Sequence, residues 1–205
     1  DSDKSETFTV QTNISKPTGV NSSSVLNDEF QAHWSTITGA IAYDLDVAED
    51  IDFNILVKNY QISGQSSSSK TVTGLKAGKK YYYRIRAMGA DIPSAYTTSD
   101  VTTTIQAPAI VAASNPGATS FTANWGAVTG VDNYLLSVST DPGFDSHYSD
   151  YNNKSFTTTS TNIAGLAIGT TYYYQVTAQG GTSSTNAVQS SNVEVSTIID
   201  APTAT

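Results

Sequence analysis

The densest group of side chains that could do chemistry is the acidic stretch YDLDVAEDIDF, residues 43–53. Carboxylates at this density are typical of calcium sites, because calcium is held by several oxygen ligands at once. Glu49, Asp50 and Asp52 are the candidate ligands. No frame of the stretch fits the calcium-loop pattern D-x-[DN]-x-[DN]-G, since counting from Asp50 puts Ile55 at the glycine position. Weak calcium binding by this turn stays open as one interpretation.

A second interpretation of the acidic stretch is ion pairing with a later strand. Asp44 and Asp46 face outward on their own strand, because successive side chains of a strand alternate between its two faces. Arg84 and Arg86 face outward on the strand that we expect beside it. The four matching positions in the second copy of an internal repeat are neutral, namely Leu135, Ser137, Gln175 and Thr177. Because all four positions are charged in one copy and neutral in the other, the charges indicate cross-strand ion pairs. Each such pair contributes about 0.2–1 kcal/mol to the stability of the sheet.

Three consecutive tyrosines occur twice, at residues 81–83 and 172–174. Tyrosine is enriched at binding surfaces, because it combines an apolar ring with a polar tip. Alternation sends the first and third tyrosine of each triplet into the core, so only the middle ones face solvent. Cross-strand neighbours can cover such a tyrosine without any ligand, which is the simpler alternative. The candidate ligand-binding residues are therefore Tyr82, Arg84, Arg86 and Tyr173.

Further aromatic side chains lie on predicted loops and sheet edges. Both tryptophans, Trp34 and Trp125, fall at core positions of their strands, so neither is available to stack on a sugar. The remaining aromatic candidates for a glycan or protein surface are Tyr60, Tyr96, Tyr148 and Tyr151. Single exposed aromatics are ordinary on protein surfaces and indicate no ligand by themselves.

No catalytic constellation is recognisable. The chain has no cysteine, which excludes thiol catalysis and cysteine zinc sites, and its two histidines, His33 and His147, occupy unrelated positions of the repeat. No G-x-S-x-G elbow is present to carry a serine nucleophile. The sequence GLKAGKK is one residue too short for a phosphate loop, and Lys80 stands where that loop needs Ser or Thr. We therefore expect no enzymatic activity, no bound cofactor and no catalytic residue.

The net charge of −8 excludes two classes of partner. Residues 1–105 hold nine of the ten basic residues, and residues 106–205 hold only Lys154. Binding to phosphates requires a basic patch, so neither nucleic acid nor an anionic membrane surface is an expected partner. Direct membrane insertion is not expected either, because no apolar run approaches the ~20 residues needed to span a bilayer.

An internal repeat is the strongest signal in the chain. At an offset of 91 residues, Trp34 matches Trp125, Tyr43 matches Tyr134, and the first tyrosine triplet matches the second. This period is too long for a solenoid repeat, so each copy should be a domain with its own core. Each copy consists of short alternating runs, such as SFTANW and TYYYQVTA, separated by Gly, Asn, Asp and Ser. About seven such strands per copy predict an all-β chain of two antiparallel β-sandwiches in tandem.

The segments LKAGKKYYYRIRA and LAIGTTYYYQVTA resemble the corner between strands E and F of fibronectin type III domains, Leu-x-Pro-Gly-Thr-x-Tyr-x-Val-x-Val-x-Ala. A Trp near the end of the second strand, a Tyr opening the third and a Pro opening the first also fit that family. Ala77 and Ile168 replace the corner proline in the two copies. The resemblance implies seven-stranded, immunoglobulin-like sandwiches in which Tyr81 and Tyr172 bond through their hydroxyls to backbone near the preceding Leu.

The resemblance also gives domain boundaries, because it covers about residues 15–200. The junction TIQAPAI between the copies is short and contains Pro108, which favours a semi-rigid connection. The expected domains are an N-terminal segment 1–14 that resembles the last strand of a preceding repeat, a first domain 15–106, a second domain 107–200, and the start of a further module or tail at 201–205.

The resemblance implies a non-catalytic structural role, as a pair of spacer modules in a longer multidomain protein. The Ser/Thr-rich, Lys-poor composition resembles that of repeats in bacterial secreted polysaccharide-degrading enzymes and surface proteins. We expect a monomer at an extracellular or cell-surface location, with a targeting segment absent from this chain and other modules of the same polypeptide as partners. The alternative is an adhesion module that binds a polysaccharide or a surface protein through its exposed loop and strand aromatics.

Overall fold

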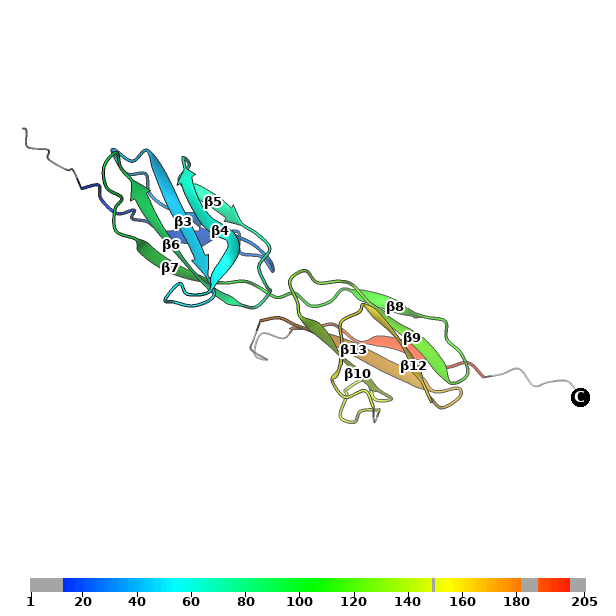
Figure 1. Cartoon of the computed structure of the whole chain (residues 1–205). Coiled ribbons are helices and arrows are strands. Elements are labelled where there is room, and N and C mark those ends of the chain that lie inside the picture. The colour runs from blue at the N-terminus through cyan, green and yellow to red at the C-terminus, as the bar shows by residue number, and fades with distance from the viewer. Residues whose placement is uncertain (1–12, 149, 182–187, 200–205) are drawn as a thin grey trace, which may run out of the picture. The chain divides into compact units, whose positions relative to one another are not determined.

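The computed structural model describes residues 13–148, 150–181 and 188–199, and all their regular structure is β-strand (Figure 1). The predicted last strand of a preceding repeat falls mostly on residues 1–12, and the predicted tail occupies 201–205; both lie outside the described residues. The runs that alternate between apolar and polar residues in the sequence are the runs that form strands, which is the pattern of half-buried sheets.

The chain divides into two compact units. The first unit consists of residues 13–25, 29–73 and 80–102. The second unit consists of the described residues from 103 onward, together with the loops 26–28 and 74–79. The predicted domain boundaries at residues 14, 106 and 200 stay predictions.

Two antiparallel sheets make up the first unit. The smaller has the order β1-β2-β5, with bounds Asn21–Ser23, Phe30–His33 and Ser69–Val72. The larger has the order β4-β3-β6-β7, with bounds Leu56–Gln65, Ala42–Ala48, Lys80–Met88 and Thr97–Thr102. Figure 1 shows β4, β3, β6 and β7 running side by side in the blue-to-green part of the chain. The long central strands β3 and β6 therefore carry both the core and an outer face.

The second unit repeats this plan. Its smaller sheet has the order β12-β9-β8, with bounds Ser160–Ala164, Ser120–Trp125 and Ile110–Ser114. In its larger sheet β13 pairs with β10, β14 and β15, and β10 pairs with β11. The bounds are Asn133–Ser139 for β10, Lys154–Phe156 for β11, Thr171–Gln179 for β13, Val188–Gln189 for β14 and Val193–Ser196 for β15. The predicted fold class of two tandem antiparallel sandwiches is confirmed.

Each sandwich has a core built from the same aromatic pairs. Trp34 packs on Tyr43 with ring centroids 5.6 Å apart, and the matching Trp125 packs on Tyr134 at 5.8 Å. The hydroxyl of Tyr43 accepts a hydrogen bond from the backbone N–H of Ile37, at 2.7 Å. The hydroxyl of Tyr134 accepts the equivalent bond from Val128, at 2.8 Å. These repeated contacts bury the large apolar surface that stabilises each domain.

The tyrosine triplets split between core and surface as alternation predicts. The burial pattern of β6 alternates strictly, with Tyr81 and Tyr83 buried and Tyr82 half-buried between them. Strand β13 does the same with Tyr172, Tyr173 and Tyr174. The Tyr172 hydroxyl accepts the N–H of Ala167 at 2.9 Å, directly after Leu166. The expected corner bond is thus confirmed in the second unit.

Candidate functional site

The register of β3 and β6 brings the acidic stretch against the two arginines. Asp44 lies opposite Arg86 and Asp46 lies opposite Arg84. The Nε of Arg84 donates to Oδ2 of Asp46 at 2.8 Å, and the Nε of Arg86 donates to Oδ2 of Asp44 at 2.9 Å. The predicted cross-strand ion pairs are therefore confirmed, and they lie on the outer face of the larger sheet.

These pairs are more deeply buried than the sequence indicates. The side chains of Asp44 and Asp46 are only 5% and 4% exposed, whereas those of Arg86 and Arg84 are 31% and 30% exposed. Alternation correctly places the carboxylates away from the core, but it does not show that they are covered. Oδ1 of Asp44 is buried and has no hydrogen-bond partner among the described residues, so both bonds from Arg86 fall on Oδ2.

Two aromatic side chains cover the arginines. The guanidinium of Arg84 lies 4.3 Å from the ring centroid of Phe53 and 4.3 Å from that of Tyr96. The guanidinium of Arg86 lies 4.9 Å from the Tyr96 centroid. Cations are attracted to the negative face of an aromatic ring, and more strongly when water is excluded. We call the six residues Asp44, Asp46, Phe53, Arg84, Arg86 and Tyr96 the arginine cluster.

Two groups of the arginine cluster have shifted pKa values, the guanidinium of Arg86 and the hydroxyl of Tyr96. The hydrogen bond that Arg86 donates to the Asp44 carboxylate raises the pKa of the Arg86 guanidinium. Burial raises the pKa of the Tyr96 hydroxyl, and the nearby Asp46 carboxylate adds to that effect. A phenol with a raised pKa does not ionise near neutral pH, so it has no role as a general base there.

The acidic turn that precedes β4 has a structural use for its central carboxylate. Oδ2 of Asp50 accepts the N–H of Asn54 at 3.0 Å, and Oδ1 accepts the N–H of Ile55 at 2.6 Å. These bonds lower the pKa of Asp50. The calcium candidates Glu49, Asp50 and Asp52 do not come together as a cluster, because no three His, Cys, Asp or Glu side chains among the described residues are grouped closely enough to hold a metal ion.

The second unit contains the same turn. Its Asp141 accepts the N–H of Gly143 and of Asp145, each at 3.0 Å, and these bonds lower the pKa of Asp141. Three positions later in each unit, Phe53 and Phe144 adopt a left-handed backbone with φ of 57° and 56°. That conformation is energetically unfavourable for a non-glycine residue. The hydrogen bonds accepted by Asp50 and Asp141 therefore stabilise a strained turn in both units.

The four tyrosines of loops and edges that were candidates for a glycan or protein surface contact the protein's own residues. The Tyr60 hydroxyl accepts the N–H of Thr73 at 2.6 Å. Tyr96 belongs to the arginine cluster, and the Tyr148 hydroxyl donates to the carbonyl oxygen of Gly165. The Nζ of Lys154 lies 4.7 Å from the centroid of the Tyr151 ring. Each of these rings or hydroxyls thus supports the local fold.

The middle tyrosines lie on central strands of the larger sheets. The Nζ of Lys80 lies 5.2 Å from the ring centroid of Tyr82, and the same lysine pairs with Asp100 at 3.0 Å. Tyr173 lies opposite Ser139 on one neighbouring strand and opposite Glu194 on the other. Both tyrosines are half-buried. Tyr82, Arg84 and Arg86 lie on β6 of the first unit, and Tyr173 belongs to the second unit.

Comparisons with known proteins agree on the fold. No family model matches the chain. It is 28% identical over 149 residues to fibronectin type III domain-containing protein 7 of the mouse and 30% identical to the human protein of that name, covering 73% of this chain and 19% of each relative. A two-domain fibronectin type III segment of chicken tenascin superposes with a TM-score of 0.63 at 19% identity, covering 88% of this chain and 98% of that segment.

Both units have the fibronectin type III fold. The chain spans about a fifth of the length of the curated relatives it matches. The tenascin likeness concerns the fold alone, so the roles of individual side chains rest on the geometry described above.

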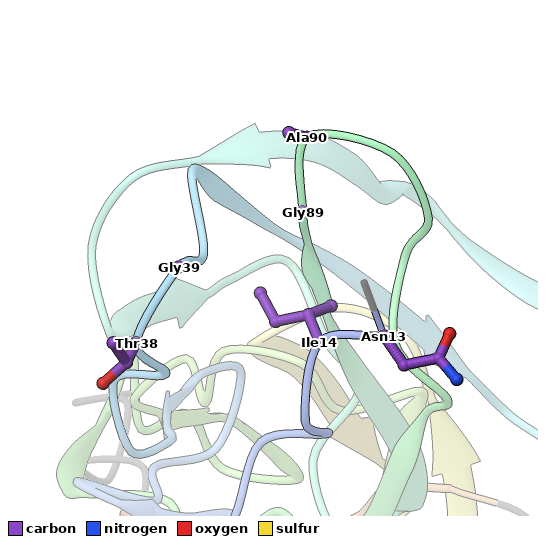
Figure 2. A pocket seen from close by; sticks show the side chains of 6 residues that line it. All are labelled: Asn13, Ile14, Thr38, Gly39, Gly89 and Ala90. Atoms are coloured by element: carbon purple, nitrogen blue, oxygen red, sulfur yellow. The ribbon is translucent and has the colours of Figure 1, made fainter. Parts of the chain in front are cut away.

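A small pocket lies at one end of the first fibronectin type III domain, and none of the candidate site residues lines it. Its volume is about 220 Å³, and it is lined by Asn13, Ile14, Thr38, Gly39, Gly89 and Ala90. Figure 2 shows the Ile14 side chain between the Thr38–Gly39 turn and the Gly89–Ala90 turn. Sequence reasoning missed this pocket because its walls are mostly backbone from three distant segments. The only available signal was the small residues Gly39, in the loop before β3, and Gly89 and Ala90, directly after β6.

No helix of the described residues is long and apolar enough to cross a membrane.

Proposed function

We propose that the two fibronectin type III domains are non-catalytic spacer modules of an extracellular multidomain protein. One observation carries this proposal: the side chains best suited to a ligand already bind partners within their own domain. Arg84 and Arg86 are paired with buried carboxylates and covered by Phe53 and Tyr96. A ligand would have to displace these contacts, and each displaced contact would weaken its binding.

The proposal that the domains are non-catalytic has a geometric basis in the histidines. His33 shares a hydrogen bond of 2.7 Å with the Ser23 hydroxyl on the surface, and the ring of His147 lies 6.1 Å from that of Phe144. A general base needs a nucleophile and an orienting group within hydrogen-bond reach, in a cleft that excludes water. The pocket in the first domain contains neither a histidine nor a carboxylate.

The extracellular location is part of the proposal. The absence of cysteine is compatible with it, because the chain has no thiol that an oxidising compartment could oxidise. The bacterial origin expected from the Ser/Thr-rich composition stays a prediction, and the curated relatives described above are mammalian.

The competing role is adhesion through Tyr82 and Tyr173, whose rings are half-exposed on the outer faces of the larger sheets. The test measures binding of the chain to immobilised polysaccharides and to extracellular matrix proteins, alongside the Tyr82→Ala/Tyr173→Ala double variant. The spacer proposal predicts no saturable binding by either protein. Saturable binding by the parent that the double variant loses would replace the spacer role with adhesion.

A further inference from the structure

The pocket of the first unit has a counterpart surface in the second unit. At the offset of 91 residues that relates the two copies of the repeat, its lining residues correspond to Thr104, Ile105, Thr129, Gly130, Gly180 and Gly181. The two backbones match beside these positions. In the first unit the N–H of Ile41 donates to the carbonyl oxygen of Met88 at 2.9 Å. In the second unit the N–H of Asp132 donates to the carbonyl oxygen of Gln179 at 2.8 Å.

The counterpart surface is covered by loops of its own unit. The second unit includes the loops 26–28 and 74–79. The N–H of Ala77 donates to the carbonyl oxygen of Gly130 at 2.8 Å, and the N–H of Gly78 donates to that of Thr104 at 3.0 Å. Ala77 is fully buried. The counterpart surface therefore binds loop 74–79 through backbone hydrogen bonds.

The close approach of loop 74–79 depends on glycine. A Cβ built on Gly180 would lie 2.2 Å from the carbonyl oxygen of Ala77, and one built on Gly181 would lie 2.9 Å from that of Gly78. Real Cβ atoms essentially never come closer than 3.0 Å to another atom, so a side chain at Gly180 would push the loop away. Glycine at this surface thus allows backbone to pack on backbone.

The pocket of the first unit keeps most of these features. Gly39 and Gly89 repeat two of the three glycines at the matching positions, and Ala90 replaces the third. A loop bound in the pocket would therefore lie slightly farther from the wall at Ala90. Among the described residues, no atom lies within 4 Å of a Cβ built on Gly39, whereas one built on the matching Gly130 would lie 2.9 Å from the backbone nitrogen of Ala77. The pocket has the walls of a loop-binding surface without the loop.

One position beside the pocket differs in charge from its counterpart. In the second unit the Nζ of Lys76 pairs with the carboxylate of Asp132. The residue that matches Asp132 is Ile41, which is 70% exposed. A lysine brought against Ile41 would lose hydration without gaining a partner, whereas an apolar residue would gain from the contact. A loop that fits the pocket therefore has an apolar residue in the place of Lys76.

We propose that the pocket of the first unit receives the corner loop of a further fibronectin type III domain, which precedes this segment in the same polypeptide. Loop 74–79 carries the corner sequence LKAGK of the repeat, and the position 91 residues before it falls outside the 205 residues. This inference rests on the proposal that the domains are modules of a longer protein. A domain held through such a loop is restricted more than one held by a short linker alone, which suits a spacer.

The chemistry of the incoming loop follows from the counterpart surface. It has a small residue in the place of Ala77 and a glycine in the place of Gly78, because both positions touch backbone. Its two N–H groups donate to the carbonyl oxygens of Gly39 and Asn13, which match the two acceptors in the second unit. The pocket volume of about 220 Å³ is below the about 300–1,000 Å³ of sites for drug-sized molecules, which agrees with a short loop of small residues.

The experiment supplies the pocket with a preceding loop at the spacing of the repeat. In an extended chain, residues 1–102 are followed directly by residues 12–205, so that a leading copy of the first domain precedes a trailing copy. Only the trailing part is isotope-labelled, by protein ligation. The amide resonances of Gly39 and Gly89 in the trailing copy should shift from their positions in the 205-residue chain. Both residues are distant in sequence from the new junction, so the junction itself does not move them.

Variants of the unlabelled leading copy show whether its loop causes the shifts. Ala77→Arg in that copy should return both resonances to their positions in the 205-residue chain, because the arginine does not fit against the glycines. Ser66→Arg, at an exposed position at the other end of β5, is the matched control and should leave the shifts unchanged. A sample labelled in the leading copy shows that each variant is folded. Absence of the shifts, or shifts that survive Ala77→Arg, overturns the proposal.

Ile41 provides a test of the partner's chemistry. With Lys76 in the leading copy, Ile41→Asp in the trailing copy should raise the equilibrium constant for docking by about twofold, since it recreates an exposed ion pair. With Lys76→Leu in the leading copy, the same Ile41→Asp change should lower that constant instead. The shift of Gly39 measures the docked fraction in all four chains. An effect of Ile41→Asp that does not depend on residue 76 would contradict the assigned orientation of the loop.

The spacer proposal fails by a different measurement. Saturable binding of the 205-residue chain to a polysaccharide or a matrix protein would replace the spacer role and would leave the shifts in the extended chain as they are. Absence of the shifts in the extended chain would overturn the docked loop and leave the binding measurement as it is.

Discussion

The outer faces of the two larger sheets have the same strand register but different chemistry. In the first domain the residues facing each other across β3 and β6 are Asp44 with Arg86 and Asp46 with Arg84. In the second domain the residues facing each other across β10 and β13 are Leu135 with Thr177 and Ser137 with Gln175. The backbone thus presents four equivalent positions twice, once with two ion pairs and once without a charge.

The second domain satisfies its polar groups by local hydrogen bonds. The Ser137 hydroxyl accepts the N–H of Asn153 at 3.0 Å and donates to the Asn153 side-chain oxygen at 3.2 Å. The side-chain amide of Gln189 donates to the side-chain oxygen of Gln175. The ring of Phe144, which matches Phe53, lies beside His147 rather than over an arginine. The two domains therefore pair the polar side chains of this face in different ways on the same backbone.

The buried carboxylates of the first domain give the largest expected effect. Arg84→Met should lower the free energy of unfolding of the first domain by about 3 kcal/mol, because it leaves Asp46 buried without its cation. The matched control is Gln175→Met at the equivalent position of the second domain, which should change stability by less than about 0.5 kcal/mol.

Each domain offers its own probe for this measurement. Trp34 and Trp125 are buried in the first and second domains respectively, so a Trp125→Phe background reports only the first domain and Trp34→Phe only the second. Denaturant unfolding followed by tryptophan fluorescence then gives both values. Equal losses for Arg84→Met and Gln175→Met would show that the buried ion pair has no special importance.

An exchange of the whole face should have a smaller effect than the single change. The quadruple variant Asp44→Leu, Asp46→Ser, Arg84→Gln and Arg86→Thr gives the first domain the residues of the second. Replacing both partners of a buried pair is often close to neutral, so we expect a change within about 1 kcal/mol in the same fluorescence assay. A loss larger than that of Arg84→Met would mean that the arginine cluster is a required part of the first domain's stability.

The sequence predicted the features that depend on local periodicity. Alternation along β6 assigned Tyr81 and Tyr83 to the core and Arg84 to the outer face, and the repeat of charges indicated that Arg84 faces an aspartate. These predictions succeed because strand alternation is a property of the backbone and needs no knowledge of distant segments.

The features that the sequence did not predict depend on where loops pack. Phe53 reaches Arg84 from a turn with positive φ, and Tyr96 reaches it from the residues before β7. No periodic signal links these loop positions to a strand residue more than ten positions away. The burial of Asp46 was missed for the same reason, because it results from the side chains that cover it. The pocket beside Gly39 is lined mostly by small residues and backbone, which give it only a weak signature in the sequence.

The smallest expected effect concerns a feature that the two domains share. Hydrogen bonds from backbone N–H groups hold the pKa of both Asp50 and Asp141 below the ordinary value of 3.8. A carboxylate with a lowered pKa in the folded state contributes stability that is fully present above its unfolded pKa and is lost as pH falls through the folded value. Both domains should therefore lose stability in acid, below about pH 4, through the same turn.

Asp50→Asn should flatten the acid dependence of the first domain and leave that of the second unchanged, and Asp141→Asn should do the reverse. An amide still accepts a hydrogen bond but does not titrate, so the variants separate the charge of the turn from its geometry. Urea unfolding between about pH 5 and pH 2.5, read through Trp34 or Trp125 alone, measures each domain. If Asp50→Asn leaves the acid dependence of the first domain intact, the turn is not its source.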